Sequence, residues 1–246
     1  VKSATDPHFD SLEFVNSAGT WSPDNRTLAI SAVRGGRPVL ALIDMRSGKI
    51  TRELSLPGLD DAFNPAFAPD GQSLVVSGNV GGLIDLYRYA MPTGQIERLT
   101  SDPYADLEAT FSPDGRTIVF VTERFTTNLE TLTPGALRLA TLELATRTVR
   151  PLVGFLRGKH LSPQVSADGL DVTFVADPDG ISNLYRVPLA GGPIDQLTST
   201  PTGVAGITAS SPTLSLAQQS GRLAFSIFEN DGHAIYILDP SQVVTL

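Results

Sequence analysis

The stretch FSPDGRTIVFVT, residues 111–122, joins a tight turn to a strand of alternating apolar residues. Pro presets φ at the first turn position, Asp bonds to nearby backbone, and Gly supplies a positive φ. Close variants of the turn begin at Ser22, Ala68 and Ser166, so with Ser112 the copies are spaced 46, 44 and 54 residues apart. A period of this length, carried by a turn and several strands, is typical of propeller blades.

The second copy shows what each repeat contains. An innermost strand at 64–67 precedes the turn, and a second strand rich in β-branched residues follows at 73–77. A Gly-rich turn at 78–82 leads to a third strand at 85–89, and another turn leads to a fourth at 95–100. Four strands per repeat predict an all-β chain, a β-propeller of four-stranded antiparallel blades.

We expect a single propeller domain over residues 1–246, with five blades visible in the sequence. The blades are expected at approximately 11–57, 58–102, 103–153, 154–199 and 200–246. The fifth repeat is degenerate, because the segment AQQSG at 217–221 replaces the tight turn and 211–214 replaces the inner strand.

The two ends of the chain leave the number of blades open. Residues 5–10 resemble 101–106, which link the second blade to the third, and residues 242–246 resemble an outer strand. This pattern favours a six-bladed propeller that is missing one blade. Alternatively, residues 1–5 pair with the fifth blade and close a ring of five. The chain begins with Val1 rather than Met, which indicates a processed form or a piece of a longer protein.

Composition excludes several classes of function. The net charge is −8 at pH 7 and the 18 Lys and Arg residues are scattered, so we expect no binding of nucleic acid. The chain contains no Cys, which removes disulfides, thiol nucleophiles and Cys-based zinc sites. Its apolar runs are far shorter than the roughly 18 residues of a spanning helix, so we expect no direct membrane span.

The repeats resemble the TolB-type β-propeller repeat, a WD40-like repeat. After the turn and strand at 111–122, the resemblance continues in the pairs Leu-Tyr, Thr-Gly and Leu-Thr, found at 86–87, 93–94 and 99–100 in the second blade. It covers nearly the whole chain and is specific for the fold. The resemblance implies a periplasmic or exported protein of the bacterial envelope. Similar repeats form the gating propellers of prolyl-oligopeptidase-like enzymes, so the resemblance does not decide the activity.

We find no catalytic set in the sequence. The Gly-x-Ser-x-Gly elbow is absent, and His8, His160 and His233 have no metal-binding spacing. We therefore expect no catalytic residues, no metal and no cofactor. Residues 177–183 (DPDGISN) suggest a calcium loop, but their Gly is fourth rather than sixth. A hairpin turn between second and third strands is the better interpretation, with Ca²⁺ as a weak alternative.

A group of polar residues is expected where the chain enters the innermost strands, at one mouth of the central channel. The candidates for binding there are Asn16, Asp61, Asn64, Asp106, Glu108, Lys159 and His160. Such a ring, net acidic, is suited to a cation, a peptide terminus or a small molecule. Alternatively, these groups satisfy neighbouring backbone amides and channel waters.

The loop at 122–135 is much longer than the corresponding turn of the second blade. Long loops in compact folds tend to be functional. Phe125, Leu129 and Leu132 are therefore candidates for a partner-binding patch. The alternative is that they fold back and cover a blade edge.

These features favour a non-catalytic protein-interaction scaffold of the bacterial envelope. It would bind one or more protein partners, including a membrane-associated complex, through rim loops and the channel mouth. The alternative is a propeller module of a larger enzyme. That module would be the gating domain of a serine peptidase, or a lyase-type propeller that uses His160 with channel carboxylates.

Overall fold

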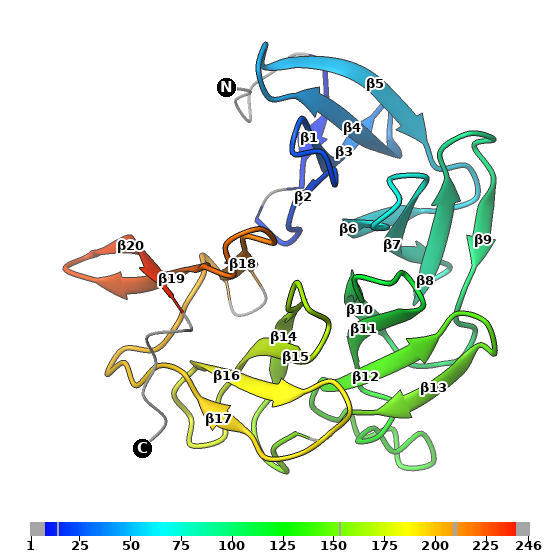
Figure 1. The fold of residues 1–246 in the computed structure, drawn as a ribbon. Coiled ribbons are helices and arrows are strands. Elements are labelled where there is room, and N and C mark those ends of the chain that lie inside the picture. Colours follow the sequence, from blue (N-terminus) through cyan, green and yellow to red (C-terminus); the bar gives the residue numbers. More distant parts are fainter. Residues whose placement is uncertain (1–7, 14, 153, 209–210, 240–246) are drawn as a thin grey trace. The chain divides into compact units, whose positions relative to one another are not determined.

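The computed structural model describes residues 8–13, 15–152, 154–208 and 211–239 (Figure 1). Its strands form five small antiparallel sheets in a five-bladed propeller arrangement, which confirms the predicted all-β class. The chain divides into two compact units, residues 1–111 and 112–246. The strand predicted at 242–246 and the pairing predicted for residues 1–5 lie outside the described ranges. Within those ranges, no helix has the length and apolar character that a membrane span requires.

The first unit contains the first two sheets and the first strand of the third. The first sheet contains β1 (Ser11–Leu12), β2 (Thr20–Trp21), β3 (Thr27–Arg34), β4 (Arg37–Asp44) and β5 (Lys49–Ser55). Both β1 and β2 pair with β3. The second sheet has the order β6 (Asp61–Phe67), β7 (Ser73–Val80), β8 (Leu83–Ala90) and β9 (Ile96–Arg98). Strand β10 (Asp106–Phe111) completes this unit.

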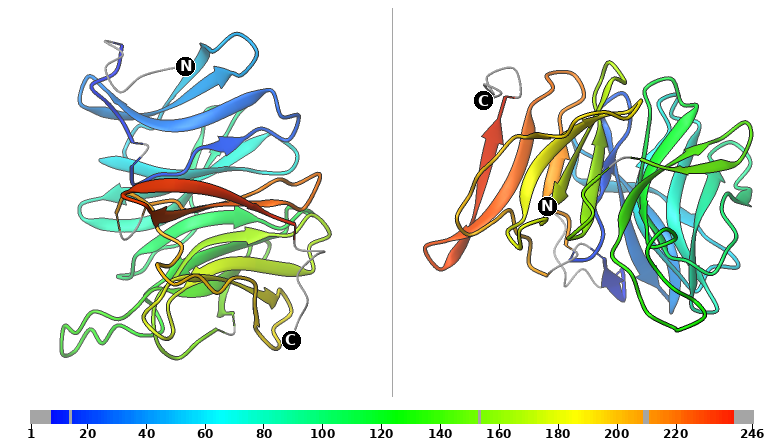
Figure 2. Two further views of the ribbon diagram at one scale, coloured as in Figure 1. Left: turned by 90° about the vertical axis from the view of Figure 1, so that its left-hand side faces the viewer. Right: turned by 90° about the horizontal axis from the view of Figure 1, so that it is seen from below.

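The second unit contains the remaining strands. The third sheet continues with β11 (Thr117–Thr122), β12 (Arg138–Glu143) and β13 (Thr148–Pro151). The fourth sheet has the order β14 (His160–Val165), β15 (Asp171–Ala176), β16 (Asn183–Pro188) and β17 (Asp195–Gln196). The fifth has three described strands, β18 (Leu214–Leu216), β19 (Leu223–Glu229) and β20 (Gly232–Leu238) (Figure 2).

Most predicted strands are confirmed, but some of them begin or end at other residues than predicted. Strands β7 and β8 extend further than predicted, to Val80 and from Leu83, so the Gly-rich turn shrinks to Gly81 and Gly82. Both glycines have a positive φ, the conformation that a two-residue hairpin turn requires. The prediction of a turn over 78–82 was therefore too wide.

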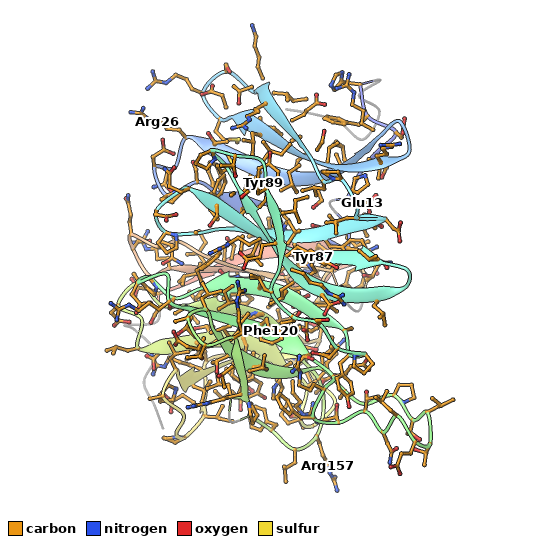
Figure 3. All side chains as sticks on the ribbon, turned by 90° about the vertical axis from the view of Figure 1, so that its right-hand side faces the viewer. Glu13, Arg26, Tyr87, Tyr89, Phe120 and Arg157 are labelled. Atoms are coloured by element: carbon orange, nitrogen blue, oxygen red, sulfur yellow. The ribbon has the colours of Figure 1, made fainter. Side chains whose placement is uncertain are left out.

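The core of the first unit lies between its first two sheets. Alternate residues of β4 and β7, including Leu40, Leu42 and Leu74, pack there with the aromatic rings of Tyr87 and Tyr89 (Figure 3). All of these side chains are almost completely buried. The alternation follows from the two-residue period of a strand, which sends every second side chain to the same face.

One buried apolar cluster of the second unit joins the fourth and fifth sheets. Leu161, Leu184, Leu223 and Phe225 are among its buried members. The other face of the fifth sheet is different: Ile235 is 78% exposed and Ile237 is 71% exposed. The fifth sheet therefore has one buried apolar face and one open apolar face.

The recurring turn is held by its own side chains. Ser112 Oγ donates to Asp114 Oδ1 (2.6 Å) and accepts from Thr117 N (3.0 Å), while Asp114 Oδ1 accepts from Arg116 N. The copies at Ser22 and Ser166 repeat this pattern. The hydroxyl of Ser112 is the main cause of the lowered pKa of Asp114.

Ala68 occupies the equivalent position in the second copy and has no hydroxyl to contribute. We expect Ala68→Ser to raise the free energy of unfolding by about 1 kcal/mol, because the new hydroxyl can repeat the Ser112 hydrogen bonds. Ser112→Ala should lower it by a similar amount. Urea unfolding of both variants measures this. A loss of stability in both would contradict the assignment, since it would mean that Ala68 has no room for a hydroxyl.

Candidate functional site

The first strands of three successive sheets carry the same distortion. Asn64, Glu108 and Ser162 occupy equivalent positions and have φ values of 49°, 52° and 51°, unusual for residues other than Gly. At Asn64 and Ser162 the pairing with the next strand shifts register, as in a β-bulge. Sequence analysis selected Asn64 and Glu108 for their polarity but did not predict this backbone conformation.

Asn64 links neighbouring segments of the first unit. Its amide Oδ1 accepts a hydrogen bond from Ala18 N (3.0 Å), and its backbone N donates to Ser17 Oγ (2.7 Å). The side chain is buried, with 8% of its surface exposed. The structure thus supports the alternative role of satisfying backbone amides at this position.

Asp61 lies at the start of β6 and is half-buried. Its Oδ1 accepts from Ala62 N (2.8 Å). Burial, with a smaller contribution from the negative charge of Glu13 (Figure 3), raises the pKa of Asp61. Asn16 is exposed in the same unit. Glu108, in β10, is half-buried as well, so the accessible members of the predicted group in this unit are Asn16, Asp61 and Glu108.

Asp106 belongs to a cluster of three carboxylates that sequence analysis did not identify. Carboxylate oxygens of Asp85, Asp102 and Asp106 lie within 4.8 Å of one another, and Asp85 and Asp106 are fully buried. Arg98 reaches Asp85 with two nitrogens, Nε at 3.1 Å and Nη2 in a closer ion pair. Thr100 Oγ1 donates to the second Asp85 oxygen (3.2 Å).

Carboxylate oxygens are suitable ligands for Ca²⁺ or Mg²⁺. Here the guanidinium of Arg98 already supplies positive charge to Asp85, and the pairing with Asp85 raises the pKa of Arg98. The corresponding residues of the fourth blade, Asn183 and Thr198, make a similar hydrogen bond without charge. The arrangement around Asp85 is therefore that of an ion pair between a buried carboxylate and a partly exposed guanidinium.

His160 is completely buried in the second unit, with an exposed fraction of 0%. Its ring lies among those of Phe155, Phe174 and Tyr185, with centroid distances of 6.2 Å and 5.2 Å to the two Phe rings. Burial, with the positive charge of Arg138, lowers the pKa of His160 to about 4. The ring is thus neutral at pH 7 and has no surface to offer a ligand in this structure.

The two ring nitrogens of His160 both face backbone N–H groups. Nε2 lies 3.2 Å from Phe155 N and Nδ1 lies 3.4 Å from Leu139 N. A neutral imidazole has one acceptor nitrogen, so only one of these contacts is a hydrogen bond. We assign it to Nε2, which has the shorter distance. Lys159, the neighbouring candidate, is half-buried, and its backbone N donates to Asp177 Oδ1 (2.6 Å).

The long loop between β11 and β12 covers residues 123–137. Phe125 and Leu129 are 41% and 42% exposed, and Leu132 is 81% exposed with a positive φ of 51°. In side view the loop extends from the second unit (Figure 2, left). The structure therefore favours the exposed patch over the alternative in which these residues cover a blade edge. The turn at 177–183 connects β15 to β16, as predicted.

The chain forms five antiparallel sheets in succession, and the second, third and fourth sheets have four strands each. This arrangement defines it as a β-propeller. Residues 9–128 match the TolB β-propeller domain, which confirms the predicted resemblance to TolB-type repeats. A TolB homolog from Chlorobium chlorochromatii is 35% identical over 103 residues, which are 42% of this chain and 22% of the relative.

Solved structures show the same fold. TolB from Acinetobacter baumannii superposes with a TM-score of 0.72 at 23% identity, over 91% of this chain and 51% of the other. A puromycin hydrolase mutant superposes with a TM-score of 0.66 at 17% identity, over 92% of this chain and 36% of the other. The chain thus spans about half the length of these relatives, or less.

Proposed function

We propose that this chain is a non-catalytic protein-interaction module of the bacterial envelope, periplasmic or exported. It binds a protein partner, as part of a membrane-associated complex, through the loop of residues 123–137. The observation that carries this proposal is the ordered loop with apolar side chains exposed at its tip. The relationship to TolB repeats supports the location and the kind of function.

The loop is internally braced. Asn128 and Thr133 form a β-bridge, and Asn128 Oδ1 accepts from Glu130 N and Thr131 N. Thr127 Oγ1 accepts from Gly135 N (2.8 Å). A loop held in one conformation loses little entropy on binding, which favours affinity. These hydrogen bonds hold the loop in a conformation in which Leu132 is exposed and does not pack against the blade.

The equivalent connections of the next two sheets also expose apolar side chains. Ile181, between β15 and β16, is 40% exposed, and Phe228, at the end of β19, is 47% exposed. Exposed apolar residues on related hairpins are characteristic of interaction surfaces. We take the loop as the main contact, because it alone among these three connections carries three such residues.

The enzyme alternative receives less support. The histidine used by its lyase-type form, His160, is buried and neutral. The similarity to a puromycin hydrolase, at 17% identity, concerns the fold. We therefore assign no catalytic role to the described residues of this chain.

Changing the loop tip tests the proposal. We expect the triple variant Phe125→Ser, Leu129→Ser, Leu132→Ser to lose the partner, because a few apolar residues at the centre of an interface carry most of the binding energy. The measurement is quantitative cross-linking in the periplasmic fraction of the source organism, with the wild-type chain as reference. The matched control is Leu156→Ser, Leu170→Ser, since both residues are also exposed.

Cross-links retained by the control and lost by the loop variant would support the proposal. Identical cross-linked proteins in wild type and loop variant would overturn it. Circular dichroism and urea unfolding of all three proteins establish that the loop variant is folded. Since Phe125, Leu129 and Leu132 have exposed side chains, we expect little change in stability.

A further inference from the structure

The second unit contains a cavity of about 290 Å³ beside the first strand of its fourth sheet. Its lining includes Leu161 and Val175 from the fourth sheet, together with Val204, which precedes the fifth. All three are buried members of the apolar core. Thr208 also lines the cavity and is exposed, so the cavity reaches the surface there. Its volume corresponds to about ten water molecules.

The degenerate repeat of the fifth blade explains why a cavity exists. In the second and fourth sheets the first strand has seven and six residues, whereas β18 in the fifth has three. Apart from the bridge at Val204, the described residues from 199 to 208 and from 211 to 213 before β18 belong to no strand. The isolated bridge between Val204 and Ile227, with hydrogen bonds between Ala205 and Ser226, ties the described part of this segment to β19. A missing stretch of inner strand therefore leaves a hollow whose floor is apolar core.

The described polar residues that line the cavity are one lysine and several residues with hydroxyl groups. Lys159 is the one charged residue among the described residues that line the cavity, and the hydroxyl residues Ser182 and Thr213 also contribute. Thr208 and Ser211 bond to each other across 2.9 Å at the rim. A lysine and hydroxyl-bearing residues that line a cavity together with apolar core residues are complementary to a molecule that joins a carboxylate to a short aliphatic group.

We propose that this cavity binds an aliphatic carboxylate. The ammonium of Lys159 pairs with the carboxylate, the hydroxyl of Thr213 donates a hydrogen bond, and the aliphatic part lies on Leu161 and Val175. Two sources share this chemistry: a free organic acid, and the carboxyl-terminal residue of a peptide. The lining as described contains no residue of the loop of residues 123–137, so binding in the cavity is tested independently of the proposed partner.

The experiment is a titration of the complete chain with N-acetyl-leucine, followed by NMR and calorimetry. We expect saturable binding, and about tenfold weaker binding of N-acetyl-leucinamide, because a hydrogen bond to a charged group is lost. Isovalerate and a tetrapeptide that ends in leucine distinguish the two sources. Tighter binding of the tetrapeptide assigns the site to a peptide terminus, and equal or weaker binding assigns it to a free acid.

Variants connect the binding to this cavity. Lys159→Met should weaken binding of N-acetyl-leucine about tenfold and leave binding of the amide unchanged. Lys49→Met is the matched control, since Lys49 is an exposed residue of β5 in the other unit. Ala205→Leu, which places extra side chain in the cavity, should abolish binding of both compounds. It provides an independent test if Lys159→Met fails to fold.

The proposal is overturned if N-acetyl-leucine does not bind the wild-type chain. It is also overturned if acid and amide bind equally well, or if Lys159→Met and Lys49→Met behave alike.

Discussion

Replacing Arg98 with Met is expected to lower the free energy of unfolding by about 3 kcal/mol, the lower end of the range for a broken buried ion pair. The carboxylate of Asp85 is fully buried, and Asp102 and Asp106 lie close to it. Without the guanidinium, the buried carboxylate of Asp85 loses its ion-pair partner while two other carboxylates remain beside it. The value is at the lower end because the Arg98 side chain is 40% exposed. Urea unfolding at pH 7 measures the loss.

The matched variants separate charge from packing. Asp85→Asn should be much less destabilising, because the fourth blade uses Asn183 at the equivalent place and Arg98 can turn to solvent. The double variant Asp85→Asn, Arg98→Met should recover most of the stability lost by Arg98→Met alone. Equal losses in the single Arg98 variant and the double variant would show that the aliphatic stem of Arg98, rather than its charge, is what matters.

Lowering the pH from 7.5 to 5 is expected to cost the protein about 2 kcal/mol through His160 alone. The pKa of His160 in the folded chain is about 4, below its ordinary value of 6.5. The unfolded chain therefore binds a proton on this residue before the folded chain does. This contribution to stability is complete above pH 6.5 and is lost as the pH falls toward 4.

His160→Gln removes the titrating group and serves as the comparison. We expect its unfolding free energy to change less between pH 7.5 and 5 than that of the wild type, whatever its absolute stability. The measurement is urea unfolding at several pH values. A pH dependence equal to that of the wild type would mean that His160 is accessible to protons in the folded state, contrary to its burial among aromatic rings.

The repeat predicted the fold well because it depends on local chemistry. Turn residues such as Pro113, Asp114 and Gly115 act on the backbone at their own position, and alternation determines which face of a strand is buried. The long loop was also identified, although the sequence left open whether Phe125, Leu129 and Leu132 are exposed or fold back over a blade edge. These features need no knowledge of which residues meet across the sheets.

The candidate site was harder to predict, because contacts between distant residues decide it. His160 looked accessible in the sequence, but a turn of the chain near Gly154 brings Phe155 against it. A Cβ on Gly154 would lie within 3 Å of the imidazole, which shows how closely that backbone covers the ring. Arg98 and Asp85 attracted no notice, since ordinary strand residues of opposite charge become a buried pair only in the folded sheet.

The strands of the second unit differ in how much free energy holds them in their sheets. Strand β15 lies inside its sheet, paired on both sides, and most of its side chains are buried. Strand β20 is the edge of the described fifth sheet, and Ile235 and Ile237 gain little from folding because they stay in contact with water. Local fluctuations that detach β20 therefore cost far less free energy than those that detach β15. Among the described strands of this unit, we therefore expect the fifth blade, whose repeat has diverged most, to open before the fourth.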